Sequence, residues 1–285
     1  MKLHKWASNR SLMRGRFQSE ATGAVPLGEV TGVLKVLGLT WNPTVDTLTF
    51  SSNDVLQFAQ QRKDTKRFLL QTTARLYDPM GFLSPFLVKA KIWFQRTWEL
   101  KLNWDDTLPN GIKQKWHEWC EGLPLLQTIQ VPRFYEHGVD GNVVSRMLHI
   151  FADASPLAYG AAAYICVKDA TGEATTSLLL AKARVAPLKK LTLPMLELMA
   201  CLIASRLFKY ISSHLKLETD EIHFWSDSMI ALYWIQGNAT RWKPFVQNRV
   251  VEIQGNDSSH PWHYFLACFL MQGKPSRPHD SRNHG

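Results

Sequence analysis

Three acidic residues stand where carboxylate chemistry could be assembled. Asp153 ends the apolar run "MLHIFAD" and Asp227 ends the run "IHFWSD", so each is expected where a strand ends. Glu197 lies in the first turns of the helix predicted from "LPMLELMACLIASRLFKYI". A carboxylate on the apolar stripe of a helix is costly unless a cation meets it. The i, i+4, i+7 spacing places Glu197 on such a stripe, with Leu193, Ala200, Cys201, Ala204 and Phe208.

Each of the three has a simpler explanation when it is taken alone. Asp153 could form a turn, Asp227 could cap the following helix, and Glu197 could be an acid favoured by the helix dipole. If the first and fourth strands are parallel neighbours, however, their carboxyl ends meet, and a helix crossing the sheet can bring Glu197 to the same point. Three uncompensated carboxylates repel one another unless divalent cations neutralise them. Hard oxygen ligands in this number suit Mg²⁺ or Mn²⁺.

The elements that must position these residues predict an α/β fold. Strand-like runs at 147–153, 159–167 and 175–185 are separated by short turns, as in an antiparallel meander. After them come the helix opened by Pro194, the strand "EIHFWSDS", and the helices "MIALYWIQ" and "RWKPFVQNRVVEIQ".

The first half of the chain has a different pattern. "VLKVLGLTWNPTVDTLTF" predicts two short strands joined by an Asn-Pro-Thr turn. Residues 64–104 have a helical period broken at "YDPMGFLSP", with Ser84 as a cap for a helix from Pro85 to Leu102. A further amphipathic helix carries Trp116 and Trp119, and the polar, turn-rich stretch 132–146 predicts a domain boundary.

Composition narrows the class of protein. The 285 residues carry a formal net charge of +9 with a pI of about 9.4, which favours a polyanionic partner. No apolar run is long enough to cross a bilayer. We expect an intracellular protein, in the cytoplasm or the nucleus, because its cysteines are widely spaced in apolar contexts and are expected to be reduced: Cys120, Cys166, Cys201 and Cys268.

Longer phrases carry a family resemblance. "FADAS…YGAA", "LPMLELMA" and "FWSDS" resemble the first motif, the helix glutamate and the third motif of the ribonuclease H fold. From about residue 30 to 254 the chain also resembles the Bel/Pao class of LTR retrotransposon polyproteins. The phrases that carry this likeness are "LGLTWNP", "ARLYDPMGFLSPFLVKAKI", "LKLNWDDTLP", "AKARVAPLKKLTLPMLELMACLIASRL", "FWSDSMIALYWI" and "RWKPFVQNRVVEIQ".

The resemblance implies a domain order and an activity. It places the end of a reverse transcriptase palm at 1–60, a mainly helical thumb and connection at 61–135, and a ribonuclease H-like mixed sheet with helices at 146–264. The implied reaction is hydrolysis of the RNA strand of an RNA–DNA hybrid by two Mg²⁺ or Mn²⁺ ions about 4 Å apart. Asp153 would bridge both ions, and Glu197 and Asp227 would complete the site. The implied partners are the hybrid and the remainder of the polyprotein.

The excess of Lys and Arg over Asp and Glu would then help to bind the phosphates of the hybrid. Trp225 and Trp242 could stack on the hybrid, although core packing is the simpler explanation for both. Solvated surface charge is likewise the simpler explanation for most of the cations that could lie near the site: Lys182, Arg184, Lys189, Lys190, Arg241 and Lys243.

Two other activities are not favoured by the residues. The polymerase site of the family resembles Tyr-x-Asp-Asp on a hairpin, whereas the one Asp-Asp pair here, Asp105–Asp106, is expected in a loop and helix cap. An aspartic peptidase needs Asp-Thr/Ser-Gly, and the nearest string, "DATG" at 169–172, is expected in a hairpin turn. The alternatives to a nuclease are a non-catalytic nucleic-acid-binding remnant with the same fold and a structural linker of the polyprotein.

The C-terminus departs from the family. The resemblance continues with a tryptophan strand, which "HPWHY" fits, and then with Asn-Pro-Ala-Asp-Leu, whose aspartate would be the fourth acidic ligand. Codons chosen for Lys274 to His284 can spell that motif when they are read one nucleotide later. We therefore expect a frameshift between about Tyr264 and Lys274 that leaves 265–285 poorly packed and the activity much reduced. Asp280 would then not be the fourth ligand.

Overall fold

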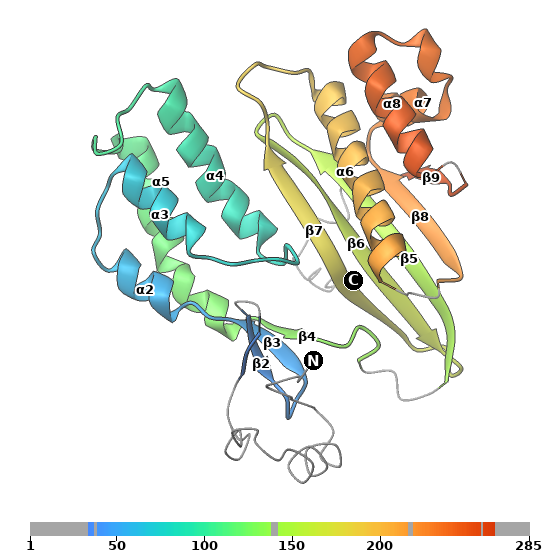
Figure 1. The fold of residues 1–285 in the computed structure, drawn as a ribbon, viewed down its shortest axis with the longest axis horizontal. Helices are drawn as coiled ribbons and strands as arrows, with labels where there is room; N and C mark the ends of the chain where they lie inside the picture. The colour runs from blue at the N-terminus through green and yellow to red at the C-terminus, as the bar shows by residue number, and fades with distance from the viewer. Residues whose placement is uncertain (1–33, 37–38, 138–141, 216–218, 258, 266–285) are drawn as a thin grey trace, which may run out of the picture.

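Two lobes with separate hydrophobic cores make up the described chain (Figure 1). The computed structural model describes residues 34–36, 39–137, 142–215, 219–257 and 259–265. All of the predicted tail at 265–285 except its first residue, Cys268 included, and the whole of segment 1–33 therefore lie outside the described residues. The first lobe combines a small sheet with helices, and the second lobe is built on a five-stranded sheet.

The small sheet of the first lobe has the strand order β1-β2-β3-β4 and is antiparallel throughout. Its strands are β1 (Leu34–Val36), β2 (Leu39–Asn42), β3 (Thr47–Phe50) and β4 (Gln130–Pro132). The predicted turn between two strands is present between β2 and β3, but the first predicted strand is divided into β1 and β2. The addition of β4 shows that the chain returns to this sheet after its helices.

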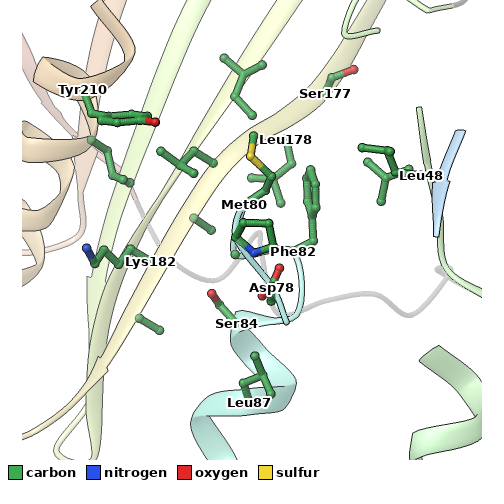
Figure 2. A pocket seen from close by; sticks show the side chains of 18 of the residues that line it. Leu48, Asp78, Met80, Phe82, Ser84, Leu87, Ser177, Leu178, Lys182 and Tyr210 are labelled. Carbon is green, nitrogen blue, oxygen red and sulfur yellow. The ribbon is translucent and has the colours of Figure 1, made fainter. Parts of the chain in front are cut away.

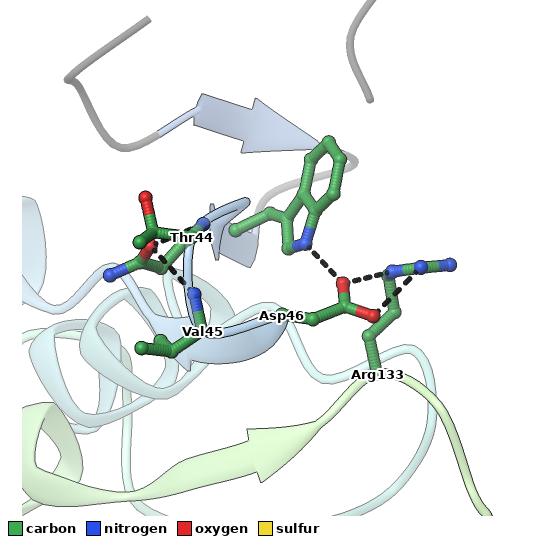
Figure 3. Close-up of polar contacts among 6 residues, drawn as sticks. Thr44, Val45, Asp46 and Arg133 are labelled. Atoms are coloured by element: carbon green, nitrogen blue, oxygen red, sulfur yellow. Dashed lines mark hydrogen bonds and ion pairs between the residues drawn. The ribbon is translucent and has the colours of Figure 1, made fainter. Parts of the chain in front are cut away.

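A polar cluster fixes the β2–β3 turn (Figure 3). The side-chain oxygen of Asn42 accepts a hydrogen bond from the backbone N–H of Thr44 at 2.9 Å. Asp46, whose φ is +53°, accepts from the indole N–H of Trp41 at 2.9 Å and from the guanidinium of Arg133 at 2.6 and 2.9 Å. Because Arg133 directly follows β4, this carboxylate ties the end of β4 to the β2–β3 hairpin.

The helices of the first lobe are α2 (Asn53–Ala59), α3 (Lys66–Ala74), α4 (Ser84–Glu99) and α5 (Asn110–Glu121), with the 3₁₀ helix η1 (Leu123–Thr128) after them. α3, α4 and α5 follow the predicted order, whereas α2 and η1 were not predicted. The helical period therefore breaks where it was predicted, and Trp116 and Trp119 of α5 are buried. The cap prediction was wrong, because Leu83 is the N-cap and Ser84 is already the first helical residue. α4 also ends earlier than the predicted Leu102.

The sheet of the second lobe has the order β7-β6-β5-β8-β9. β5 (Val143–Ala154), β6 (Ala158–Asp169) and β7 (Ala174–Val185) form the predicted antiparallel meander. β8 (Glu221–Ser226) pairs in parallel with β5, and β9 (Trp262–Tyr264) pairs in parallel with β8. The expectation that the first and fourth strands are parallel neighbours is confirmed.

Helices cover one face of this sheet. α6 (Leu193–His214), which contains Pro194 in its first turn, packs on β5 and β6, and α8 (Pro244–Asn256) packs against α6 (Figure 1). Alternation along β5 turns Leu148, Ile150 and Ala152 toward α6, where they are buried. The short helix α7 (Met229–Gln236) follows β8, and the 3₁₀ helix η2 (Ala239–Arg241) precedes α8, whose predicted start at Arg241 was three residues too early.

The two lobes meet at β7, one of the two edge strands of the five-stranded sheet. α4 lies against β7, and the loop before it carries "YDPMG". The backbone N–H of Ala181 donates to the carbonyl of Met80 at 2.8 Å, and the Gln95 amide donates to the carbonyl of Ala186 at 2.6 Å. Gly81 has φ +77°, and a Cβ there would lie 1.9 Å from the carbonyl oxygen of Ala181. This glycine therefore lets the helical lobe approach the strand closely.

We predict that Gly81→Ala is far more destabilising than Gly172→Ala. Gly172 has φ +93° but no atom within 4 Å of its Cβ position, so this control variant bears only the positive-φ cost of about 1–2 kcal/mol. Gly81→Ala adds the clash with Ala181, which we expect to cost about 1–3 kcal/mol more. Urea unfolding of the full chain measures both, and equal losses would show that the close approach is unimportant.

Candidate active site at the ends of β5 and β8

The parallel pairing brings the three predicted carboxylates to one end of the sheet. Ala152 of β5 is in register with Ser226, the last residue of β8, so Asp153 within β5 and Asp227 directly after β8 are the next residues along two adjacent chains. α6 begins at the same end of the sheet, and Glu197 lies in its first turns (Figure 1). The structure therefore juxtaposes the three residues, while their catalytic role remains a prediction.

Burial and the neighbouring carboxylates raise the pKa of Asp153 and of Glu197. Burial by the surrounding protein, followed by the charge of Asp227, raises the pKa of Asp153 above its ordinary 3.8, although Asp153 keeps exposed surface. Burial also raises the pKa of Glu197, to which the charges of Asp227 and Asp153 add, against a hydrogen bond from Ser228 that lowers it. Among the described residues, no cationic side chain contributes to either pKa shift. The described part of the chain thus leaves this negative charge uncompensated.

Asp227 carries the clearest sign of a missing partner. Its Oδ1 atom is buried and has no hydrogen-bond donor among the residues that the structure describes. The alternative that Asp227 caps the following helix was wrong, because the N-cap of α7 is Ser228, whose hydroxyl accepts the N–H of Ala231 at 3.1 Å. A buried carboxylate oxygen without a donor is the kind of atom that a hard divalent cation satisfies.

The donor chemistry fits Mg²⁺ or Mn²⁺, but the side chains are not closed around an ion. Within the described ranges, no group of three or more His, Cys, Asp or Glu side chains is arranged to hold a metal as it stands. The hydroxyl of Ser228 donates to Oε2 of Glu197, so one oxygen of that carboxylate already has a protein partner. Sequence reasoning missed Ser228, for which the only signal was a serine placed between Asp227 and an apolar helix.

The predicted nucleic-acid-binding cations are spread over several elements. Lys182 and Arg184 lie on β7, and β6 separates β7 from β5. The other four lie in the β7–α6 loop (Lys189 and Lys190), in η2 (Arg241) and at the N-cap of α8 (Lys243). All six are exposed, and none takes part in an ion pair within the described part of the chain. The structure therefore shows solvated cations around the sheet and none bound to the three carboxylates.

The two predicted stacking tryptophans have protein partners. The indole of Trp242 donates to the carbonyl of Trp234 at 3.2 Å, and its ring packs against the core, as the simpler explanation required. Trp225 lies on the sheet face opposite α6, where its indole donates to His149 at 3.2 Å and its ring stacks on Phe151 with 6.0 Å between centroids.

A cavity of about 1230 Å³ lies elsewhere, between the lobes (Figure 2). It is lined by Asp78, Met80 and Phe82 from the first lobe and by Lys182 and Tyr210 from the second. None of the three carboxylates lines it. The candidate site is therefore the open end of the sheet, separate from the interlobe cavity.

The residues considered for other activities are occupied by local structure. Asp169 of "DATG" closes the β6–β7 hairpin, because its Oδ1 accepts from the N–H of Thr171 at 2.9 Å and of Glu173 at 3.0 Å. Asp105 pairs with Arg67 at 2.8 Å in a loop. Asp105–Asp106 do not cap α5, however, because its N-cap is Pro109.

The described cysteines and helices are ordinary. Cys120, Cys166 and Cys201 are free, and burial raises the pKa of both the Cys120 and the Cys201 thiol to about 12. Among the described residues, no helix has the length and apolarity needed to cross a membrane.

Comparison with protein families decides the relationship. Residues 65–228, more than half of the chain, match the family model of the Pao retrotransposon-like RNaseH-like domain. The chain belongs to this family. The matched region of this Pao domain begins at Thr65, beside α3, and ends at Ser228, so it includes α3, α4 and α5 as well as β5–β8.

Solved structures give distant likenesses. A foamy viral protease-reverse transcriptase in complex with an RNA/DNA hybrid is 14% identical with a TM-score of 0.48, over 89% of this chain and 32% of that one. RNase H1 of the halophilic archaeon Halobacterium salinarum is 11% identical with a TM-score of 0.28, over 44% of this chain and 88% of that one. The Pao chain spans about a third of the foamy viral chain, and no curated protein matches it. The family match, together with the mixed sheet and its helices, confirms the predicted family and the ribonuclease H-like mixed α/β fold.

We predict that Asp153→Asn stabilises the metal-free protein at neutral pH. The folded pKa of Asp153 lies above its ordinary 3.8, so folding stability falls as pH rises from 3.8 through the raised pKa and stays lower above it. Asparagine does not ionise, so the gain should be full at pH 7 and absent below about pH 3.8. Thermal unfolding in a chelator measures it. The control Asp54→Asn, in the exposed first turn of α2, should give no gain, and an equal gain there would contradict the prediction.

Proposed function

We propose that this Pao domain hydrolyses the RNA strand of RNA–DNA hybrids at Asp153, Glu197 and Asp227. The observation that carries the proposal is the juxtaposition of three carboxylates in which burial and the charge of Asp227 raise the pKa of both Asp153 and Glu197, with no opposing cation among the described residues. Two Mg²⁺ or Mn²⁺ ions bound there would supply the positive charge that an attacking water and a leaving oxygen require. The buried oxygen of Asp227, which lacks a donor, supports its assignment as a ligand.

The protein residues of the site have distinct tasks in this proposal. Asp227 is held between the end of β8 and the start of α7, and Glu197 is held by its hydrogen bond from Ser228. Asp153 keeps exposed surface, so a phosphate can approach it from solvent. An open sheet end suits a long polymer, whereas an enclosed pocket suits a small ligand.

The net charge of the whole 285-residue chain, together with exposed cations near the site, supports a polyanionic substrate. The net charge is +9, and the β7–α6 loop and the η2–α8 junction carry exposed cations at Lys189, Lys190, Arg241 and Lys243. Contacts of this kind bind phosphates without reading sequence. We propose the RNA–DNA hybrid and the remainder of the polyprotein as the partners.

We further propose that catalysis by this chain is impaired. No fourth carboxylate contributes to the pKa shifts of Asp153 and Glu197 among the described residues. A site with three acidic ligands neutralises less cation charge and leaves more of each ion's coordination to water.

Cleavage of a labelled RNA–DNA hybrid by the full chain in Mg²⁺ tests the proposal. We expect slow cleavage that chelator removes and that Asp153→Asn lowers by at least about 100-fold, because a bound metal contributes several kcal/mol to the transition state. The matched control Asp54→Asn should cleave as the unaltered chain does. Equal cleavage by the Asp153→Asn variant would show that the activity belongs elsewhere.

The same samples distinguish a nuclease from a non-catalytic nucleic-acid-binding remnant. The exposed, unpaired cations support this second candidate function as well. Hybrid affinity should fall with salt, with a logarithmic slope of about −0.9 for each phosphate contact. Salt-dependent binding without any cleavage would leave the nucleic-acid-binding remnant as the function. Absence of both would leave a structural linker.

Restoring the family reading frame tests the impairment. A chain in which 265–285 is replaced by the sequence of the shifted frame, with its Asn-Pro-Ala-Asp-Leu, should cleave the hybrid faster and at lower Mg²⁺ concentration than the chain described. The nucleotide sequence over residues 260–285 provides the first check, because codons that forbid this motif in the shifted frame exclude a frameshift.

A further inference from the structure

We propose that Ser228 is a positioning residue that presents Glu197 to the divalent cations, an inference that rests on the proposed function. Ser228 is 4% exposed and lies at the junction of β8 and α7, directly after Asp227. Its hydroxyl contacts one group on each side, the N–H of Ala231 and the carboxylate of Glu197.

The direction of both hydrogen bonds follows from elementary chemistry. A backbone N–H can only donate, so the Ser228 oxygen accepts from Ala231, at 3.1 Å. A hydroxyl has a single proton, and an ionised carboxylate can only accept, so that proton goes to Oε2 of Glu197. Capping of α7 therefore orients the hydroxyl, and the oriented hydroxyl holds the glutamate.

The hydrogen bond from Ser228 to Glu197 opposes the electrostatic repulsion among the three carboxylates. The like charges of Asp153 and Asp227 would drive a free Glu197 toward solvent, and a glutamate side chain has enough rotamers to move away. The bond from Ser228 keeps the carboxylate beside Asp227 and uses only Oε2. Among the described residues no donor reaches Oε1, which leaves that oxygen for a cation.

The backbone links Ser228 to the neighbouring ligand as well. The N–H of Ser228 donates to the hydroxyl of Ser226 at 3.3 Å, across Asp227. Two buried serines thus flank Asp227, and one of them also holds Glu197. A change at Ser228 should therefore alter cation binding before it alters the fold.

Calorimetric titration of the metal-free full chain with Mn²⁺ tests this role without relying on cleavage. Ser228→Gly removes the proton donor, but glycine costs an N-cap only a few tenths of a kcal/mol. We expect Mn²⁺ affinity to fall about 10- to 100-fold, as when an outer partner of a metal ligand is lost. Ser228→Thr keeps a hydroxyl with both bonds and should retain the affinity. The matched control is Thr65→Gly, which removes the cap of α3, where Thr65 accepts from Phe68 at 3.2 Å away from the site.

The outcomes distinguish this inference from the proposed function. Mn²⁺ binding by the unaltered chain that Asp153→Asn removes supports the metal site, and no such binding refutes both. If that binding is present and Ser228→Gly leaves the affinity unchanged or higher, the role of Ser228 is overturned while the nuclease proposal stands. Should the glycine variant fail to fold, Ser228→Cys preserves the size of the side chain with a weaker donor, and its affinity should fall in the same direction.

Discussion

The meeting of three carboxylates at the ends of two parallel strands is the constraint on which the candidate site of the second lobe depends. Parallel strands require a crossover connection, and here α6 and the antiparallel strands β6 and β7 supply it between β5 and β8. The same α6 that returns the chain to a parallel position also delivers Glu197 to the strand ends. The topology therefore creates both the sheet and its most costly concentration of charge, which only a partner from outside the described chain can neutralise.

Much of this arrangement could be predicted because it depends on periodicity and strand ends. The alternation in β5, β6 and β7, the apolar stripe of α6 and the acidic residues at the ends of β5 and β8 are local patterns, and local patterns are visible in one sequence. Ser228 was not found, because a serine after an aspartate predicts only a cap. Its second bond depends on how α6 packs on the sheet.

Other differences have the same origin in tertiary contacts. Lys66 begins α3 and would be expected in solvent, yet it is 2% exposed, with its ammonium 3.3 Å from the ring centroid of Trp98 and bonded to the carbonyl of Leu102 at 3.0 Å. The aromatic partner is more than thirty positions away in the sequence, so no local pattern indicates it. "YDPMG" likewise predicts a helix break and reveals nothing of the strand that Gly81 approaches.

The family match extends over both lobes, which agrees with the physical junction between them. β7 is an edge strand of its sheet, and an edge strand presents backbone groups that can pair with another extended chain. On this edge the N–H of Ala181 donates a hydrogen bond to the carbonyl of Met80, and α4 lies alongside β7. The helical lobe therefore covers part of this edge, and a fragment beginning at β5 would leave these backbone groups of β7 available to another extended chain.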